Sequence, residues 1–127
     1  MKIIDGHMHT KGAPGRWFAD CADARGYEAY AVLSLSCMQA YGGDRNNEEC
    51  LAAKRADPAR AYFFAGLVHP CADPLQHVRR WLDRGADGVK LIETKPTVWK
   101  ETGADLSDAA FDPLFAFLEE SQTPVLW

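Results

Sequence analysis

Short apolar runs alternate with amphipathic segments along the whole chain. The runs have the length of β-strands, and their apolar residues are nearly continuous rather than strictly alternating. This pattern is typical of strands that are covered on both faces of a parallel sheet. It predicts five strands, within KIID (2–5), AYAVLSLS (29–36), AYFFAGLV (61–68), GVKLIE (88–93) and PVLW (124–127).

The segments between these runs carry helix signals. The clearest helix is expected to start at Asp73, whose carboxylate suits an N-cap, and at Pro74, which is tolerated in the first helical turn. Gly85 suits its end, because glycine adopts the left-handed conformation without strain. The segment 94–108 is expected to be a long loop. Three more helices are expected, one from Asp112 that ends before Pro124, one from Asn46 or Asn47 to just before Pro58, and one between Arg16 and Arg25.

The order of these elements, βαβαβαβαβ, predicts an α/β fold with a parallel sheet and right-handed crossovers. Either an open doubly wound sheet or about half of a (β/α)8 TIM-type barrel fits this order. The turn DGHMHT (5–10) lacks the glycine-rich phosphate-binding fingerprint that a dinucleotide fold carries after its first strand. A barrel places its catalytic groups at the carboxyl ends of its strands, where His7 and His9 fall. We therefore expect about half of a barrel.

Composition narrows the function classes. The 127 residues are 47% hydrophobic and 25% charged, as expected of one soluble globular domain. A net charge of -4 without a basic run disfavours a nucleic-acid partner. The sequence shows neither a secretion signal nor a run that could span a bilayer, so we expect a cytoplasmic protein with no membrane partner. The four cysteines are widely spaced and are expected to be reduced and mostly buried.

Two histidines follow the first strand with one residue between them. On an extended chain, residues two apart point to the same side, so Asp5, His7 and His9 are expected to project together. Converging neutral imidazoles are good ligands for zinc, iron or manganese. The alternative is that they are two polar residues at a strand end that make loop hydrogen bonds. Their place after an N-terminal strand and an Asp-Gly pair favours metal binding.

Other polar residues lie at the ends of the predicted strands and form the rest of the possible pocket. Lys90 lies in an apolar strand, where burial is costly, so it is expected either to pair with Asp5 or Glu93 or to anchor a substrate. Glu93 has the opposite parity to Lys90, and is expected to be a surface loop carboxylate. His69 ends the third strand at the pocket rim, where it could bond substrate or cap a loop. His77 is expected to be solvated.

Three segments carry a resemblance to a known family. IIDGHMHT (3–10) resembles the first-strand signature of the amidohydrolase superfamily, GADGVKLIE (85–93) is similar to its fourth-strand segment, and FDPLFAFLEESQTPVLW (111–127) is similar to the helix and strand of the decarboxylase-like, amidohydrolase-related branch. The resemblance implies a metal-dependent TIM barrel with His7 and His9 as two metal ligands. It also implies that another ligand histidine and the catalytic base lie beyond Trp127. Residues 1–127 would then be the N-terminal half of a barrel, apparently truncated in strand five.

The resemblance further implies a divalent metal cofactor, most simply zinc, with manganese or iron as alternatives, and a small-molecule substrate. Hydrolysis of a small amide, ester or lactone is the expected reaction of the complete enzyme, and metal-assisted non-oxidative decarboxylation is the first alternative. Some superfamily members carry a carbamylated lysine at the position of Lys90, although the decarboxylase-like branch usually binds one metal without it. HMHT (7–10) also fits the opening of PHP-type phosphoesterases, which ranks third.

A half barrel leaves two open sheet edges. The chain alone is therefore expected to bind metal weakly and to be inactive or incomplete, to associate with a second copy through these edges, or to act as a non-catalytic half barrel. In the loop 94–108, Lys95 and Lys100 could attract an acidic substrate, although solvated loop lysines are the more frequent case.

Overall fold

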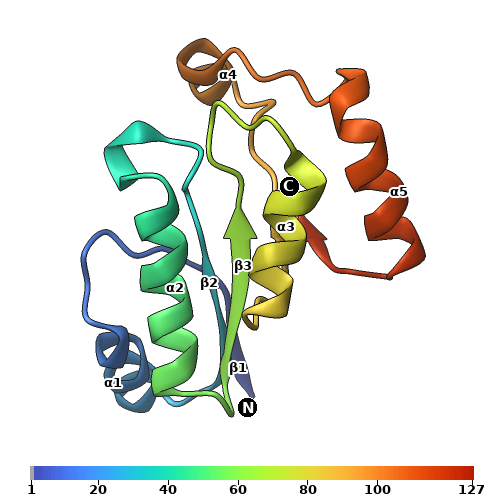
Figure 1. Ribbon diagram of the computed structural model, residues 1–127. Coiled ribbons are helices and arrows are strands. Elements are labelled where there is room, and N and C mark those ends of the chain that lie inside the picture. Colours follow the sequence, from blue (N-terminus) through green and yellow to red (C-terminus); the bar gives the residue numbers. More distant parts are fainter. Residues whose placement is uncertain (1) are drawn as a thin grey trace.

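The computed structural model describes residues 2–127. Five parallel strands form one curled sheet in chain order, with β1 and β5 at its edges (Figure 1). The expected half barrel is confirmed, and the open doubly wound alternative is not, because that topology reverses the strand order within the sheet. The strands are β1 (Ile3–Met8), β2 (Tyr27–Leu33), β3 (Ala61–Gly66), β4 (Gly88–Lys90) and β5 (Val125–Leu126).

Helices connect consecutive strands and cover one face of the sheet (Figure 1). Four of them lie where helices were predicted: α1 (Gly15–Arg25), α2 (Asp44–Ala56), α3 (Pro74–Asp83) and α5 (Asp112–Glu120). A further helix and two short 3-10 turns complete the described elements: α4 (Pro96–Thr102), η1 (Gln39–Tyr41) and η2 (Ala109–Phe111). In Figure 1, α4 lies beyond the carboxyl end of β3, at the edge of the sheet where a barrel carries its site.

Local signals place most helix ends, with two exceptions. Asp73 caps α3 as predicted, because its Oδ1 accepts a hydrogen bond of 2.9 Å from a backbone N–H of the first turn. α2 begins at Asp44, before the two asparagines that were expected to open it. The segment expected to be a loop contains α4, which Pro96 opens and which ends at Gly103 with a φ of 66°. The prediction missed this helix although Pro96 and Gly103 signal its two ends, because the segment is short and has no side-chain N-cap.

The main core lies between the sheet and the helices. Trp81 of α3 is fully buried, and its ring packs edge-on against Phe63 of β3 with the ring centroids 5.9 Å apart. The indole N–H of Trp81 donates to Asp44 Oδ1 at 3.1 Å, so its polar atom is also satisfied. The buried members of this cluster are Phe18, Ala22, Tyr30, Val32, Cys50, Leu51, Ala53, Ala61, Phe63, Ala65 and Trp81.

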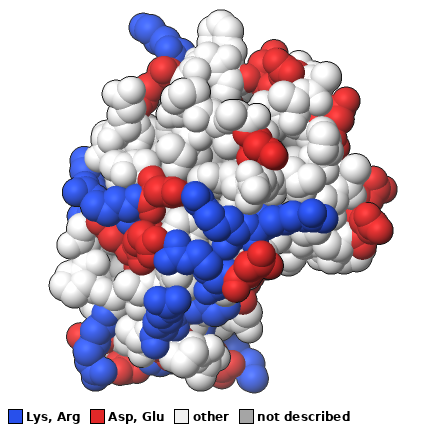
Figure 2. All heavy atoms as spheres, viewed as in Figure 1, with Lys and Arg blue, Asp and Glu red and all other residues white. Residues whose placement is uncertain are grey.

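Ion pairs join α2 to α3 across the surface of this core. Arg80 contacts Asp44 at 2.5 Å, and Arg84 makes two hydrogen bonds to Glu48 at 2.6 and 2.7 Å. Figure 2 shows a band of basic and acidic side chains across the middle of the molecule. Because these groups are partly exposed, we expect each pair to add little stability.

The opposite face of the sheet is only partly covered. Side chains alternate along β3, so Tyr62 and Phe64 point away from the helix side, where Phe63 is buried. Tyr62 is 50% exposed, and Ile4 of β1, which pairs with Ala29 rather than with the buried Tyr30, is 69% exposed. The expectation that the strands are covered on both faces is therefore wrong at these positions. The physical reason is that the inner face of a barrel is buried only when the remaining strands close it.

The cysteine thiols were expected to be reduced and mostly buried. The four cysteines are free thiols, and burial raises the pKa of Cys37 to about 12. Cys37 and Cys50 are buried, whereas Cys21 and Cys71 are half-buried, so the expectation of mostly buried thiols is confirmed for two of the four. None of the helices within residues 2–127 combines the length and the apolar character that a bilayer span requires.

Candidate metal centre

The two histidines lie together at the carboxyl end of β1. His7 belongs to the strand, and His9 follows its last residue. Their Nε2 atoms are 2.9 Å apart, and their ring planes meet at 84°. The imidazoles therefore converge as the spacing predicted. Asp5 does not join them, because its Oδ1 accepts a hydrogen bond of 3.1 Å from the backbone N–H of His7.

The backbone carbonyl of Leu33 fixes the tautomer of His9. His9 Nδ1 lies 2.7 Å from this oxygen, and an oxygen of this kind can only accept, so Nδ1 carries the ring hydrogen. His9 Nε2 then presents its lone pair, to which His7 Nε2 donates. Histidines that ligate metals are typically held in this way, with the second ring nitrogen bonded to a carbonyl or carboxylate. His9 is thus oriented as a ligand by the fold itself.

The surroundings favour the neutral form of both imidazoles. Burial lowers the pKa of His7, and the positive charges of His9, Lys90 and Lys95 lower it further. The Asp5 carboxylate opposes this shift. Burial is also the largest cause of the lowered pKa of His9, with smaller contributions from the same two lysines and an opposing one from the carbonyl hydrogen bond. Neutral imidazole is the form that binds a metal ion, so the shift favours binding at neutral pH.

The two nitrogens are near enough to share an ion. With metal–nitrogen bonds of about 2.0–2.1 Å, two nitrogens 2.9 Å apart subtend an angle of about 90° at the ion, so tetrahedral zinc would replace their hydrogen bond and move them slightly apart. Among residues 2–127, no group of three or more His, Cys, Asp or Glu side chains is placed to hold a metal. Protein metal sites usually take four or more ligands, so the two histidines alone are fewer than such a site needs.

Lys90 adds a positive charge beside the histidines. It is only 2% exposed, and its charge contributes to the lowered pKa of both imidazoles. Neither predicted partner pairs with it, because Asp5 bonds the His7 backbone and Glu93 bonds His69. The predicted pairing is therefore wrong. Burial, followed by the charge of Lys95, lowers the pKa of the Lys90 ammonium.

Replacing Lys90 with methionine is expected to raise the free energy of unfolding at pH 7 by less than about 1 kcal/mol, because it removes a partly desolvated ammonium group that pairs with no carboxylate among the described residues. The pKa of Lys90 is lowered from 10.5 in the fold, so the unfolded chain holds the proton more tightly and wild-type stability should rise as the pH approaches 10.5. The variant should lose that rise. Urea unfolding at pH 7 and at pH 10 measures both effects, and a variant less stable than wild type at both values contradicts them.

His69 and Glu93 form a buried pair at the ends of β3 and β4. Glu93 is fully buried, and its Oε1 lies 3.0 Å from His69 Nε2. The prediction of a surface carboxylate is wrong, because β4 ends at Lys90 and the parity of the strand no longer applies three residues later. Among the described residues, Glu93 Oε2 is the one buried side-chain oxygen or nitrogen without a hydrogen-bond partner. His69 is therefore bonded to a carboxylate rather than capping a loop.

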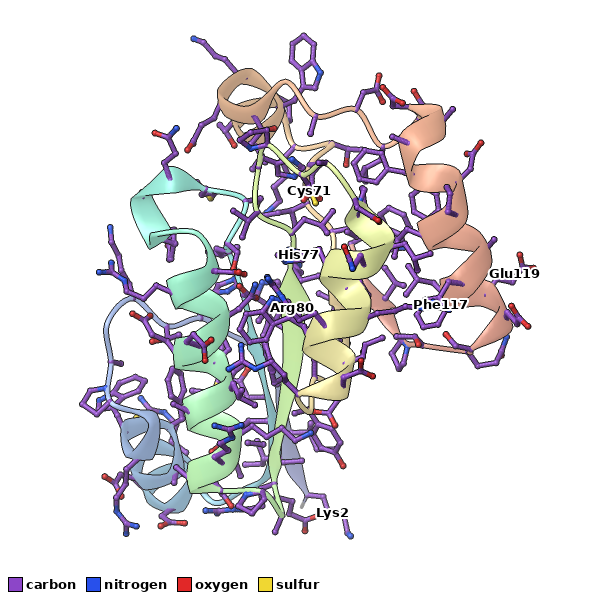
Figure 3. All side chains as sticks on the ribbon, viewed as in Figure 1. Lys2, Cys71, His77, Arg80, Phe117 and Glu119 are labelled. Carbon is purple, nitrogen blue, oxygen red and sulfur yellow. The ribbon has the colours of Figure 1, made fainter. Side chains whose placement is uncertain are left out.

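His77 also differs from its prediction. Its side chain is only 11% exposed, and its Nε2 lies 3.2 Å from the carbonyl oxygen of Gly66. Burial lowers the pKa of its imidazole. Figure 3 shows His77 and Arg80 between α3 and α2, where Asp44 contacts both. The sequence showed a polar helix face but not the neighbouring helix that covers it.

The sequence interpretation missed two buried amides. Asn46 and Asn47 are both fully buried in the first turn of α2, and both bond to backbone groups of neighbouring segments. The sequence had indicated only that a helix starts there. Two consecutive asparagines after a buried parallel strand were the one local signal that could have indicated such a role.

Comparison with known proteins identifies the fold. No protein-family model and no curated protein sequence matches the chain. The structure of a probable 2-pyrone-4,6-dicarboxylic acid hydrolase from Acinetobacter baumannii, with citric acid bound, matches with a TM-score of 0.67 and 18% identity, over 98% of this chain and 48% of that chain. The structure of 4-oxalomesaconate hydratase, LigJ, from Rhodopseudomonas palustris matches with a TM-score of 0.61 and 17% identity, over 97% of this chain and 51% of that chain.

This chain spans about half the length of each of these two solved structures. The likeness confirms the predicted fold, that of about half of a TIM-type barrel.

Proposed function

We propose that the chain provides the N-terminal half of the active site of a metal-dependent hydrolase of the amidohydrolase superfamily, with a small ester, lactone or amide as substrate. The observation that carries the proposal is the convergence of His7 Nε2 and His9 Nε2 at 2.9 Å, with the His9 ring oriented by the Leu33 carbonyl. A divalent ion bound there, zinc before manganese or iron, supplies Lewis-acid activation of water at neutral pH.

Lys90 and Lys95 define the substrate class that we propose, a small molecule with a carboxylate group. Both lysines are close enough to the histidines to affect their pKa, so an anionic group beside the ion would meet positive charge. A carboxylate near Lys90 would also supply the counter-charge that the fold does not. The names of the two solved structures include a dicarboxylic acid, citric acid and oxalomesaconate, which agree with this choice.

Hydration of an unsaturated carboxylic acid is the second candidate, because one of the two solved structures is a hydratase. It would use the same histidines and the same lysine anchor. Metal-assisted decarboxylation would need the same groups, but no observation favours it here, and none favours a PHP-type phosphoesterase.

The rest of the site would come from a second half barrel. Two ligands are fewer than a metal site needs, and the inner face of the sheet at Ile4 and Tyr62 is partly exposed. Further strands, either of a longer polypeptide or of a second copy bound through the edges of the sheet, would cover this face and contribute the remaining ligands. We also propose that the protein is cytoplasmic.

The test is an activity assay of the chain, and of a longer protein that contains it, on small lactones and esters with and without carboxylate groups. We expect the longer protein, which includes the second half barrel, to turn over substrate. This turnover should require zinc and should be lost when a chelator removes the metal. Lys90→Met should raise KM for the carboxylated substrates only. Equal activity before and after metal removal would overturn the proposal.

A further inference from the structure

Asn46 lies at the junction of the two loops that surround His9. It belongs to the first turn of α2 and is fully buried. Its Nδ2 donates to the carbonyl oxygen of Thr10 at 2.8 Å, and Thr10 is the residue that follows His9. Asn46 therefore holds the backbone of the residue next to His9, whose ring we assign as a metal ligand.

The same side chain holds the segment that orients that ring. Asn46 Oδ1 accepts hydrogen bonds from the backbone N–H of Leu35 at 2.8 Å and from the hydroxyl of Ser34 at 3.3 Å. Leu35 lies two residues after Leu33, whose carbonyl fixes the His9 tautomer. Asn46 thus connects the segment that carries His9 to the segment that carries the Leu33 carbonyl, the hydrogen-bond acceptor of His9.

A carboxylate completes the contacts of this amide. Asn46 Nδ2 also lies 3.2 Å from Glu49 Oε2, which accepts a second hydrogen bond, of 3.0 Å, from the backbone N–H of Gly12. The loop after His9 is therefore held to α2 at two points. Because its amide oxygen and its amide nitrogen are both hydrogen-bonded, the Asn46 side chain has one orientation. That orientation fixes the two loops to which it bonds.

We propose that Asn46 is a positioning residue for the metal centre, which sets the distance and the orientation of His9 relative to the Leu33 carbonyl. The inference rests on the proposed function in that it takes His9 as a metal ligand. Its physical basis is that groups beyond the first ligands tune affinity by fixing the ligand rings, and their loss typically costs about 10–100-fold in metal affinity.

Asn47 provides a matched control. It is equally buried in the same helical turn, and it also bonds to two backbone groups and a carboxylate. Its backbone partners, however, are the N–H and the carbonyl of Gly66 at the end of β3, both at 3.0 Å. A loss of stability should therefore be similar for both asparagines, whereas an effect on His9 should be specific to Asn46.

The experiment compares Asn46→Ala with Asn47→Ala, and Asn46→Asp with Asn47→Asp as a second, isosteric pair in case an alanine variant fails to fold. Asn46→Asp keeps the acceptor for Leu35 and loses the donor to Thr10. Zn²⁺ affinity is measured by calorimetry, urea unfolding gives the stability, and ¹⁵N NMR of the imidazoles in the metal-free chain reports the tautomer of His9.

We expect the Asn46 variants to bind Zn²⁺ at least about tenfold more weakly than wild type and to lose the single His9 tautomer, while the Asn47 variants stay within about twofold. Equal losses of Zn²⁺ affinity in the Asn46 and Asn47 variants would overturn the inference. An unchanged ¹⁵N spectrum of His9 in the Asn46 variants would also overturn it. If wild type binds no Zn²⁺ at these histidines, the proposed function fails, and the tautomer comparison in the metal-free chain still decides whether Asn46 positions His9.

Discussion

Replacing Trp81 with alanine is expected to lower the free energy of unfolding by about 3–5 kcal/mol, the usual cost of removing a buried aromatic side chain. Trp81 is fully buried, packs on Phe63, and satisfies its indole N–H with Asp44. Small domains are stable by only about 5–15 kcal/mol, and this sheet has a partly exposed inner face, so the variant should be largely unfolded at 37 °C.

Trp99→Ala is the matched control. Trp99 lies in α4 and is 56% exposed, so its removal should change the unfolding free energy by less than about 0.5 kcal/mol. Urea denaturation followed by far-ultraviolet circular dichroism measures both variants. Similar losses for the two tryptophans would mean that the core between α3 and the sheet is not the main source of stability.

Replacing His9 with alanine is expected to weaken Zn²⁺ binding by more than about 100-fold, since removing a ligand costs more metal affinity than removing a residue that only orients one. His7→Ala should have a comparable effect, because each histidine provides one of the two converging nitrogens. His77→Ala is the control, since this imidazole lies at Gly66 between α3 and α2 and should leave Zn²⁺ affinity unchanged.

The pH dependence of this binding follows from the lowered pKa values. Protonation competes with the metal as the pH approaches the pKa of each imidazole, and both pKa values are lowered from 6.5 in the fold. The affinity should therefore decline at a lower pH than it would for two imidazoles of ordinary pKa. Calorimetric titration between pH 5 and pH 8 measures the profile, and protonation of either imidazole with a midpoint above pH 6.5 would contradict the burial-driven shift.

Local features allowed much of the fold to be predicted from the sequence. Asp73 with Pro74, and Asp112 with Pro113, act on their own helix starts, so the sequence alone located α3 and α5. The convergence of His7 and His9 is also local, because it needs only an extended chain with one residue between them.

Features that depend on another element could not be predicted in this way. Glu93 is buried beside His69, which follows a different strand, and His77 is buried because α2 lies against α3. Asn46 contacts two separate segments that both precede its helix in sequence, at Thr10 and at Leu35. Each of these contacts joins elements whose relative placement the sequence pattern does not contain.

We propose above all that His7 and His9 form a metal-binding pair in the fold. The most direct test is titration of the wild-type chain with Zn²⁺, followed by ¹⁵N NMR of its imidazoles. We predict that the Nε2 signals of His7 and His9 shift together with a single equivalent of Zn²⁺, while those of His69 and His77 do not move. Zinc that binds the cysteines or His69 and leaves the His7 and His9 signals unchanged would contradict the claim.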